Sequence, residues 1–153
     1  MTDHPQVWHY GLVARWWAEF NTDGPEIDYF RKLIERYGEP ALDVACGTGR
    51  LLIPFLRAGV DIDGSDVSPD MVALCSEKAR REGLTARLYH QPMHELALPR
   101  KYRTIVVCGG LGLGGSLRAM LTIAGFQDVQ VLADYTEDPA TADSGILIYI
   151  ARR

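Results

Sequence analysis

A glycine turn that directly follows a short apolar run constrains this chain more than any other feature. A short buried strand is predicted over residues 41–45, and Cys46-Gly47-Thr48-Gly49 comes immediately after it. Glycines at the end of a strand let a ligand approach the backbone closely. The helix that follows presents free N–H groups to such a ligand. The order strand, turn, helix therefore predicts a ligand site at the edge of an open α/β sheet.

Strand and helix patterns alternate through the first two thirds of the sequence. Strands are predicted over residues 41–45, 60–65, 85–89 and 103–108, and helices over residues 25–37, 50–58 and 69–82. Ser68-Pro69 is typical of a helix start, because serine caps the first turn and proline fits the first helical position. This alternation predicts βαβ units and a parallel sheet with helices on both faces.

The two ends of the sequence differ from this alternating pattern. The first twenty residues are rich in aromatic side chains, and Leu12, Trp16 and Phe20 have the spacing of one apolar helix face. Near the other end we expect a short helix over residues 117–124 and strands over 129–133 and 146–151. The polar stretch between these strands is long enough for an antiparallel hairpin loop. The whole pattern predicts an α/β, Rossmann-like doubly wound fold, mostly parallel, with an antiparallel C-terminal strand pair.

Composition excludes several classes of protein. The 153 residues are 47% apolar and 24% charged, which is ordinary for a globular domain and excludes a disordered chain or a fibre. A net charge of −4 argues against general binding to nucleic acid. No stretch approaches the roughly 18 apolar residues of a membrane-spanning helix, so we expect no membrane partner. The three cysteines, Cys46, Cys75 and Cys108, form no CxxC pair, which predicts free thiols and a cytoplasmic protein.

Asp66 adds a second part to the predicted ligand site. It follows Gly47 by nineteen residues and ends the second predicted strand. A carboxylate in that position can accept hydrogen bonds from both hydroxyls of a ribose. Leu52 replaces the third glycine of the dinucleotide fingerprint, and Arg50-Leu51 stands where a phosphate-binding Walker loop needs lysine and serine or threonine. A nucleoside ligand without a pyrophosphate is therefore favoured.

Other patterns have weaker interpretations. Residues 110–115 also satisfy G-x-G-x-x-G, with Asp134 nineteen residues after Gly115, which keeps a nicotinamide site open as a distant alternative. Asp61, Asp63 and Asp66 resemble a metal-binding set, but side chains alternate along a strand. We therefore predict no metal site and expect Asp61 and Asp63 to be solvated. The basic pair Arg100-Lys101 is predicted to be plain surface.

At these residues the chain resembles the class I S-adenosylmethionine-dependent methyltransferases. The resemblance rests on four blocks whose order and spacing agree with the family. The blocks are residues 42–49, 64–71, 90–99 and 105–109. It implies S-adenosylmethionine as cofactor, S-adenosylhomocysteine as product, and methyl transfer to a small-molecule acceptor. It also implies a single domain with a helical lid over residues 1–40, a cofactor-binding half over 41–115, and a C-terminal helix and strand pair over 116–153.

The resemblance implies a role for each candidate site residue. Asp43 would orient the glycine turn, and Asp66 would hold the ribose hydroxyls. The backbone lining the methionine half would come from Ala45, Cys46, Gly47 and Gly49. The adenine would be flanked by Val67 and Met71 and contacted by the backbone of Met93 and His94, because Pro92 replaces the acidic residue often found in the family. The residues near the sulfonium would be Cys108 and Gly109, and those covering the methionine end would be Tyr10, Arg15 and Trp17. No catalytic base is assigned among His9, His90 and His94.

The resemblance is interrupted in the second half of the chain. It is continuous to about Gly115 and resumes at Leu117 with the end of the same family. The family's intervening helix and fifth strand have no counterpart, so the chain resembles a methyltransferase that lacks its middle near Ser116-Leu117. A cofactor-binding remnant without catalysis is therefore an alternative to the enzyme. In a shortened chain the final strand would have to pair beside the fourth, and an uncovered sheet edge would favour pairing with a second copy.

Overall fold

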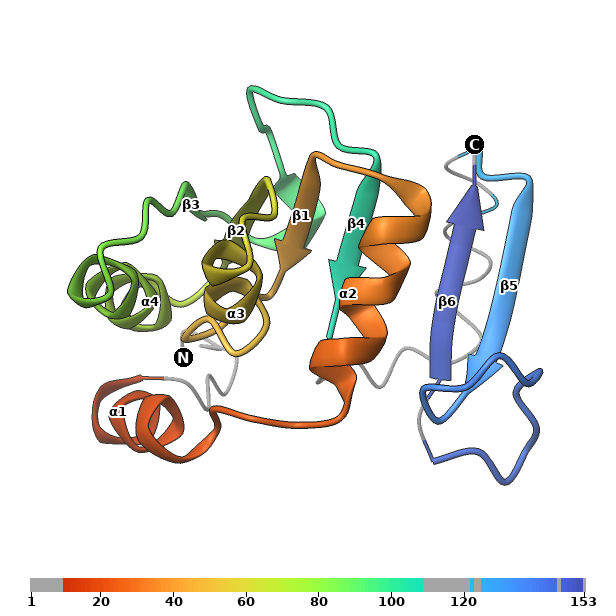
Figure 1. The fold of residues 1–153 in the computed structure, drawn as a ribbon, viewed down its shortest axis with the longest axis horizontal. Helices are drawn as coiled ribbons and strands as arrows, with labels where there is room; N and C mark the ends of the chain where they lie inside the picture. Colours follow the sequence, from red (N-terminus) through yellow and green to blue (C-terminus); the bar gives the residue numbers. More distant parts are fainter. Residues whose placement is uncertain (1–9, 109–121, 123–124, 146, 153) are drawn as a thin grey trace, which may run out of the picture. The chain divides into compact units, whose positions relative to one another are not determined.

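The computed structural model describes residues 10–108, 122, 125–145 and 147–152. The chain divides into two compact units, Met1–Gly109 and Gly110–Arg153. The elements of the first unit, in chain order, are α1 (Gly11–Phe20), α2 (Glu26–Tyr37), β1 (Ala41–Val44), α3 (Leu52–Arg57), β2 (Ile62–Asp66), α4 (Pro69–Arg81), β3 (Leu88–His90), the 3-10 helix η1 (Met93–Glu95) and β4 (Thr104–Val107) (Figure 1).

The four strands of the first unit form a parallel sheet in the order β3-β2-β1-β4. Ala41 of β1 lies opposite Ile62 of β2 and Thr104 of β4. β3 pairs with the second half of β2, where His90 lies opposite Asp66. Because the strands are parallel, their carboxyl ends meet at one end of the sheet, called the carboxyl edge below. Their amino ends meet at the opposite end, called the amino edge. This arrangement confirms the predicted α/β fold and brings the glycine turn and the end of β2 to the same edge.

The core of this unit lies where the sequence pattern expects it. All residues of β1 and β2 are buried, as strands covered on both faces should be. Phe30 and Ile34 of α2 are 6% and 1% exposed and form the buried face of that helix. The start of α4 is also as predicted: Ser68 Oγ accepts a hydrogen bond from the Met71 amide at 3.2 Å, and Pro69 takes the first helical position.

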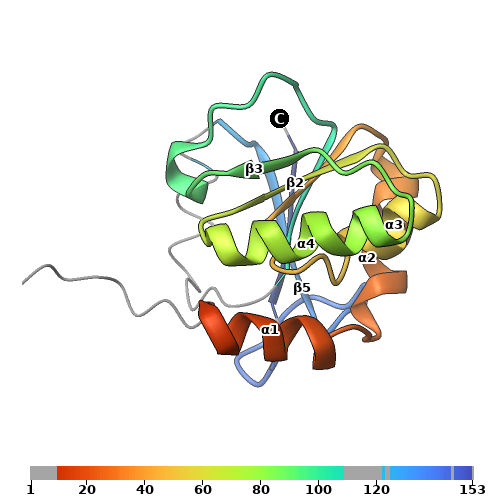
Figure 2. The same cartoon turned by 90° about the vertical axis from the view of Figure 1, so that its left-hand side faces the viewer.

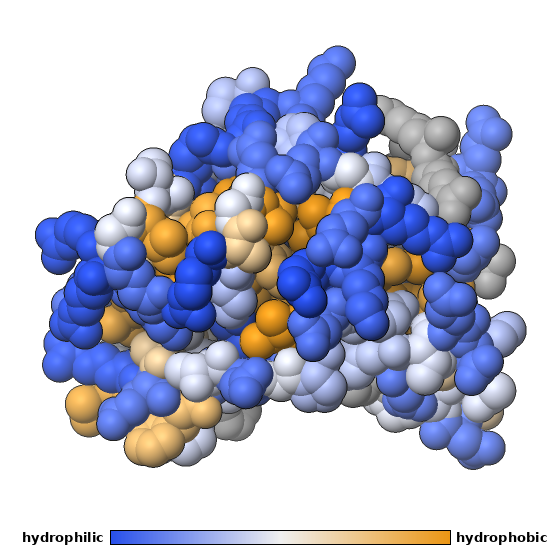
Figure 3. Space-filling model, in the orientation of Figure 1, coloured by the Kyte–Doolittle hydropathy of each residue, from blue (hydrophilic) through white to orange (hydrophobic). Residues whose placement is uncertain are grey.

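Helix α1 lies beside α4, on the side toward which the arrowheads of β1 and β4 point (Figures 1 and 2). Ala14 is its only fully buried residue. The apolar face predicted for Leu12, Trp16 and Phe20 exists, but it faces solvent, with exposed fractions of 82%, 57% and 63%. Figure 3 shows apolar atoms at the surface over this helix. The position of α1 therefore depends little on apolar packing.

The second unit contains an antiparallel pair, β5 (Asp128–Ala133) and β6 (Leu147–Arg152), with Asp128 opposite Arg152. The predicted C-terminal strand pair is thus confirmed. Within its own unit β6 pairs with β5, and pairing of the final strand beside the fourth stays a prediction.

Two further expectations concern parts of the chain that are not described. The helix expected over residues 117–124 and the glycine run 110–115 lie outside the described residues, apart from Thr122. The junction at Ser116-Leu117 lies outside them as well. No helix within the described ranges is long and apolar enough to cross a membrane.

Candidate functional site

The turn after β1 has an unusual backbone. Ala45, Gly47 and Gly49 all adopt positive φ, at 58°, 56° and 91°. The Cys46 amide donates to the Ser65 carbonyl at 3.0 Å and so fixes the turn to β2. A Cβ at Gly49 would lie 2.7 Å from an Ile53 side-chain carbon, whereas a Cβ at Gly47 would meet nothing within 4 Å. Gly49 is thus required by packing within the protein, and Gly47 leaves open backbone that a ligand can approach.

Asp66 lies against this turn, as the spacing predicts. Its side chain is almost buried, with the residue 8% exposed. Oδ2 accepts a hydrogen bond from the Gly47 amide at 2.9 Å, and Oδ1 accepts one from the Ser68 amide at 2.8 Å. An ionised carboxylate offers about four acceptor positions. The two backbone bonds fix its orientation and leave about two positions for ligand hydroxyls.

Asp43 is the second carboxyl group at this edge. It is 2% exposed. Burial, with a smaller contribution from the negative charge of Asp66, raises the pKa of Asp43 from 3.8 to about 8. The group is therefore largely protonated at neutral pH. A cation brought beside Asp43 would lower this pKa and favour the carboxylate.

The two thiols near the turn are packing groups. Cys46 and Cys75 are 6% and 0% exposed, and both are free cysteines. A hydrogen bond with Cys75, together with burial, raises the pKa of Cys46 well above its ordinary value. A neutral buried thiol is a poor nucleophile. This agrees with the prediction that Cys46 packs rather than reacts.

The predicted adenine residues follow β2 and β3. Met71 is 1% exposed, whereas Val67 and Met93 are 51% and 40% exposed. The ring Nε2 of His90 lies 2.9 Å from the Val67 carbonyl, and the Gln91 amide donates to the Asp66 carbonyl at 3.1 Å. These contacts hold the end of β3 against the segment that follows Asp66. The site would therefore be bordered on this side by residues 67 and 90–94.

The remaining predicted residues lie in two other segments. Tyr10, immediately before α1, is 40% exposed, Arg15 is exposed and Trp17 is half-buried. The Gly11 amide donates to Asp70 Oδ2 at 2.6 Å, which ties the start of α1 to α4. Cys108, after β4, is half-buried. His9 and Gly109 lie outside the described residues.

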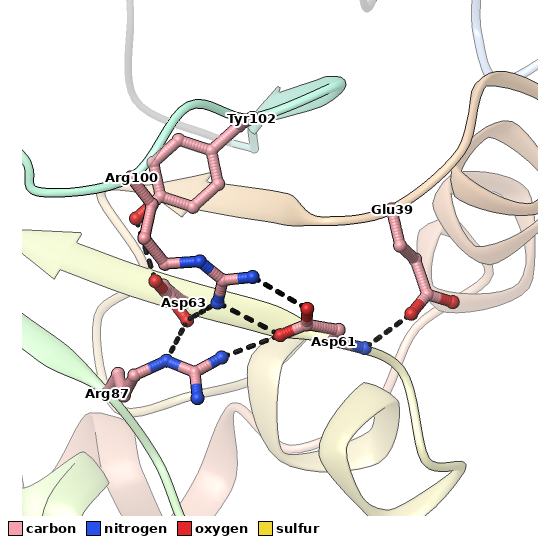
Figure 4. Close-up of polar contacts among 6 residues, drawn as sticks. All are labelled: Glu39, Asp61, Asp63, Arg87, Arg100 and Tyr102. Carbon is pink, nitrogen blue, oxygen red and sulfur yellow. Dashed lines mark hydrogen bonds and ion pairs between the residues drawn. The ribbon is translucent and has the colours of Figure 1, made fainter.

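Asp63, near the opposite end of β2, corrects one sequence prediction. It is not solvated but 0% exposed. Its Oδ1 accepts from Arg87 Nε at 2.7 Å and from Arg100 Nη1 at 3.1 Å, and its Oδ2 accepts from the Tyr102 hydroxyl at 2.7 Å (Figure 4). The prediction was wrong because it assumed that water covers this face of β2. Instead the face is covered by Arg87, before β3, and by Arg100 and Tyr102, before β4.

Asp61 and Arg100 complete this cluster and correct the rest of that prediction. Asp61 accepts from Nη2 of Arg87 and Nη2 of Arg100, each at 2.6 Å, so it is paired although its side chain is 44% exposed. Its amide donates to Glu39 Oε2 at 2.7 Å (Figure 4). Arg100 is therefore part of an ion-pair network and not plain surface. These contacts form one polar network at the amino edge of the sheet, made up of Glu39, Asp61, Asp63, Arg87, Arg100 and Tyr102.

Comparison with known proteins gives the family. A methyltransferase domain family matches residues 41–124. A dTDP-3-amino-3,6-dideoxy-alpha-D-glucopyranose N,N-dimethyltransferase of Streptomyces fradiae is 31% identical over 113 residues, covering 68% of this chain and 42% of its own length. A ubiquinone biosynthesis O-methyltransferase of Xanthomonas euvesicatoria is 27% identical, covering 56% of this chain and 39% of its own length. The chain thus spans about two fifths of the length of these relatives.

Solved structures agree on the fold. The magnesium protoporphyrin IX methyltransferase of Synechocystis PCC 6803, crystallised with bound S-adenosylmethionine, aligns with a TM-score of 0.59 at 21% identity, over 83% of this chain and 73% of that one. The family match decides against the nicotinamide alternative, and it covers more than half of the sequence. The chain belongs to the class I S-adenosylmethionine-dependent methyltransferases.

Proposed function

We propose that this protein binds S-adenosylmethionine at the carboxyl edge of its sheet and transfers the methyl group to a small-molecule acceptor. The observation that carries the proposal is the contact between Asp66 and Gly47, at 2.9 Å. A carboxylate with remaining acceptor capacity thus lies beside a glycine around whose missing Cβ there is open space. The relatives support a small-molecule acceptor, since one is an N,N-dimethyltransferase named for an amino sugar and the other an O-methyltransferase.

The residues around this contact fit the cofactor. Asp66 would accept hydrogen bonds from the two ribose hydroxyls, for which its two backbone bonds leave capacity. The open backbone at Gly47 would accept the methionine half. Asp43, whose pKa is raised to about 8, would be favoured as a carboxylate by the cofactor's ammonium group. The other residues proposed to contact the cofactor are Tyr10, Arg15, Trp17, Ala45, Cys46, Gly49, Val67, Met71, Met93, His94, Cys108 and Gly109.

The reaction asks the protein chiefly for position. The cofactor, when bound, supplies a methyl group that its sulfonium already activates. The protein would contribute by aligning the acceptor with that group and by keeping water out, which together account for much of the rate in transfers of this kind. No general base is assigned: His90 Nε2 is engaged with the Val67 carbonyl, and His94 is exposed beside Glu95. We further propose a cytoplasmic location, which the free thiols at Cys46, Cys75 and Cys108 support.

Calorimetric titration with S-adenosylhomocysteine tests the binding site. The intact chain should bind one equivalent, and Asp66→Ala should lose about 3 kcal/mol of binding free energy, since two hydrogen bonds to a charged group are removed. Asp28→Ala is the matched control, because it removes an exposed carboxylate that pairs with Arg31 within α2. Absence of binding by the intact chain, or equal affinity in both variants, would sink the proposal.

Methyl transfer needs a separate measurement. The intact chain is incubated with S-adenosylmethionine and a panel of small-molecule amines and phenols, and S-adenosylhomocysteine is measured by mass spectrometry. Release that depends on one acceptor is the expected result. Binding without release for any acceptor would instead favour the cofactor-binding remnant.

A further inference from the structure

Helix α1 is tied at both ends to segments that carry the proposed cofactor site. At its start the Gly11 amide donates to Asp70 Oδ2 at 2.6 Å. At its end, Arg50 donates through Nη1 to Asn21 Oδ1 at 2.6 Å and through Nη2 to the Asp23 carbonyl at 2.9 Å. Arg50 directly follows the glycine turn, and Asp70 comes four residues after Asp66. The two ties therefore start from the two segments that would hold the methionine half and the ribose.

Arg50 is built into its position. Besides the two bonds to the connection between α1 and α2, its guanidinium forms an ion pair with the carboxylate of Glu26, whose side chain is 4% exposed. A Cβ at Gly24 would collide with the side-chain ends of both Arg50 and Glu26, so a larger residue there would have to displace this ion pair. One side chain thus fixes the end of α1 and the start of α2 against the glycine turn.

Among the described residues, α1 buries little apolar surface. Ala14 is its only fully buried residue, and Leu12, Trp16 and Phe20 are mostly exposed. A short helix that buries little apolar surface gains little stability from packing. Its position should therefore respond strongly to the loss of either polar tie.

We propose that Arg50 and Asp70 are positioning residues that clasp α1 over the cofactor edge, and that this clasp sets how long the cofactor stays bound. The inference rests on the proposed function for its effect on the cofactor, but the clasp itself is a property of the protein alone. Neither residue need touch the cofactor. Loss of one tie should let α1 move away from the edge, which speeds dissociation more than it slows association.

The sequence provides a reporter for the clasp. All three tryptophans, Trp8, Trp16 and Trp17, lie in the first twenty residues, so tryptophan fluorescence reports on this region alone. Quenching by acrylamide is measured on the intact chain without cofactor. Arg50→Gln and Asp70→Ala should both increase quenching. Asp70→Asn should resemble the unmodified protein, because its amide oxygen can still accept from Gly11.

Arg57→Gln is the matched control. Arg57 pairs with Glu82 through two hydrogen bonds, at 3.0 and 2.6 Å, and so connects α3 to the end of α4. The Arg57→Gln substitution removes one arginine and one ion pair of the same unit, and it should leave the quenching of tryptophan fluorescence unchanged. A merely structural effect of losing an arginine would appear in this variant as well.

Stopped-flow dissociation of S-adenosylhomocysteine tests the consequence. The rate should rise roughly tenfold in Arg50→Gln and Asp70→Ala, which corresponds to the loss of about one charge-assisted hydrogen bond, and it should not change in Arg57→Gln or Asp70→Asn. Quenching and dissociation in both clasp variants equal to those of Arg57→Gln would overturn the inference. If Arg50→Gln fails to fold, Asp70→Ala decides. If the intact chain does not bind S-adenosylhomocysteine, the proposed function fails, and the quenching still decides on the clasp.

Discussion

The two ends of strand β2 treat a carboxylate in opposite ways. Asp63 is 0% exposed and bonded to two guanidinium groups and a phenol, whereas Asp66, three residues on, is 8% exposed and bonded to two backbone amides. Cations pair fully with the first charge and hold the segment before β4 to the sheet. Backbone amides orient the second charge without neutralising it. The same residue type on one strand therefore stabilises the fold at one edge and remains available to a ligand at the other.

The pKa values show the same contrast. At the amino edge, a hydrogen bond and an ion pair with Arg100, reinforced by Arg87, lower the pKa of Asp61. Its pairing therefore stabilises the fold above its ordinary pKa, and this contribution is lost as pH falls through the lowered value. At the carboxyl edge, burial raises the pKa of Asp43 from 3.8 to about 8, so the folded protein holds a proton that the unfolded chain releases. The contribution of Asp43 to stability therefore falls as pH rises between these two values.

The largest expected effect is at the amino edge. Asp63→Asn keeps the shape of the side chain but removes the buried charge facing Arg87 and Arg100, which both stay paired with Asp61. The loss of the charge-assisted hydrogen bonds to Asp63 should lower the free energy of unfolding by about 3 kcal/mol. Asp61→Asn, at a side chain 44% exposed to solvent, should cost about 1 kcal/mol or less. Urea unfolding measures both, and equal losses would contradict the difference in burial. The affinity of the folded protein for S-adenosylhomocysteine should not change.

Gly47→Ala tests the proposed close approach of the cofactor at the carboxyl edge. Within the protein the new methyl group meets nothing within 4 Å, so it would occupy only the space proposed for the ligand. Affinity for S-adenosylhomocysteine should fall at least about tenfold, which is 1.4 kcal/mol. Gly83→Ala is the control: Gly83 has a similar φ of 69° and equally open surroundings, but it follows α4 at the far end from the site. Both variants should lose similar stability, and a similar loss of affinity in both would refute the close approach at Gly47.

The difference between the edges also explains what the sequence could predict. Gly47 and Asp66 both end a strand or follow one, so recognising two parallel strands is enough to bring them together. Asp63 lies 24 residues from Arg87, 37 from Arg100 and 39 from Tyr102. The contact between these side chains depends on the register of β3 and on the path of the segment before β4. Hydrophobic periodicity predicts neither of them. For the same reason the strand predicted over residues 85–89 is found at Leu88–His90, and the ties of Arg50 and Asp70 to α1 were missed.

Asp43 allows a smaller effect to be followed by pH. If the ammonium of the cofactor lies beside Asp43, binding must release the proton that the buried carboxyl group holds, so affinity for S-adenosylhomocysteine should rise severalfold from pH 6.5 to pH 8. Asp43→Asn should bind more weakly and show no such rise over this range. Calorimetry in two buffers of different ionisation enthalpy detects the released proton directly. Identical pH profiles for the two proteins would mean that the ammonium lies elsewhere.

The smallest effect concerns the strain that the turn carries. Ala45 has a φ of 58°, in the left-handed region, which costs a residue with a Cβ about 1–2 kcal/mol. Glycine would relieve this strain, but the greater conformational entropy of glycine in the unfolded chain would offset part of the gain. Ala45→Gly should therefore raise the free energy of unfolding by about 0.5–1 kcal/mol. Ala58→Gly, at the end of α3 with a φ of −80°, should lower it instead, because no strain is relieved there. Thermal unfolding of the two variants gives the sign of each change. Ala45→Gly could instead lose as much stability as Ala58→Gly. The alanine methyl group would then stabilise the turn by more than the left-handed backbone costs. In that case packing would determine the conformation of the carboxyl edge, as charge pairing does at the amino edge.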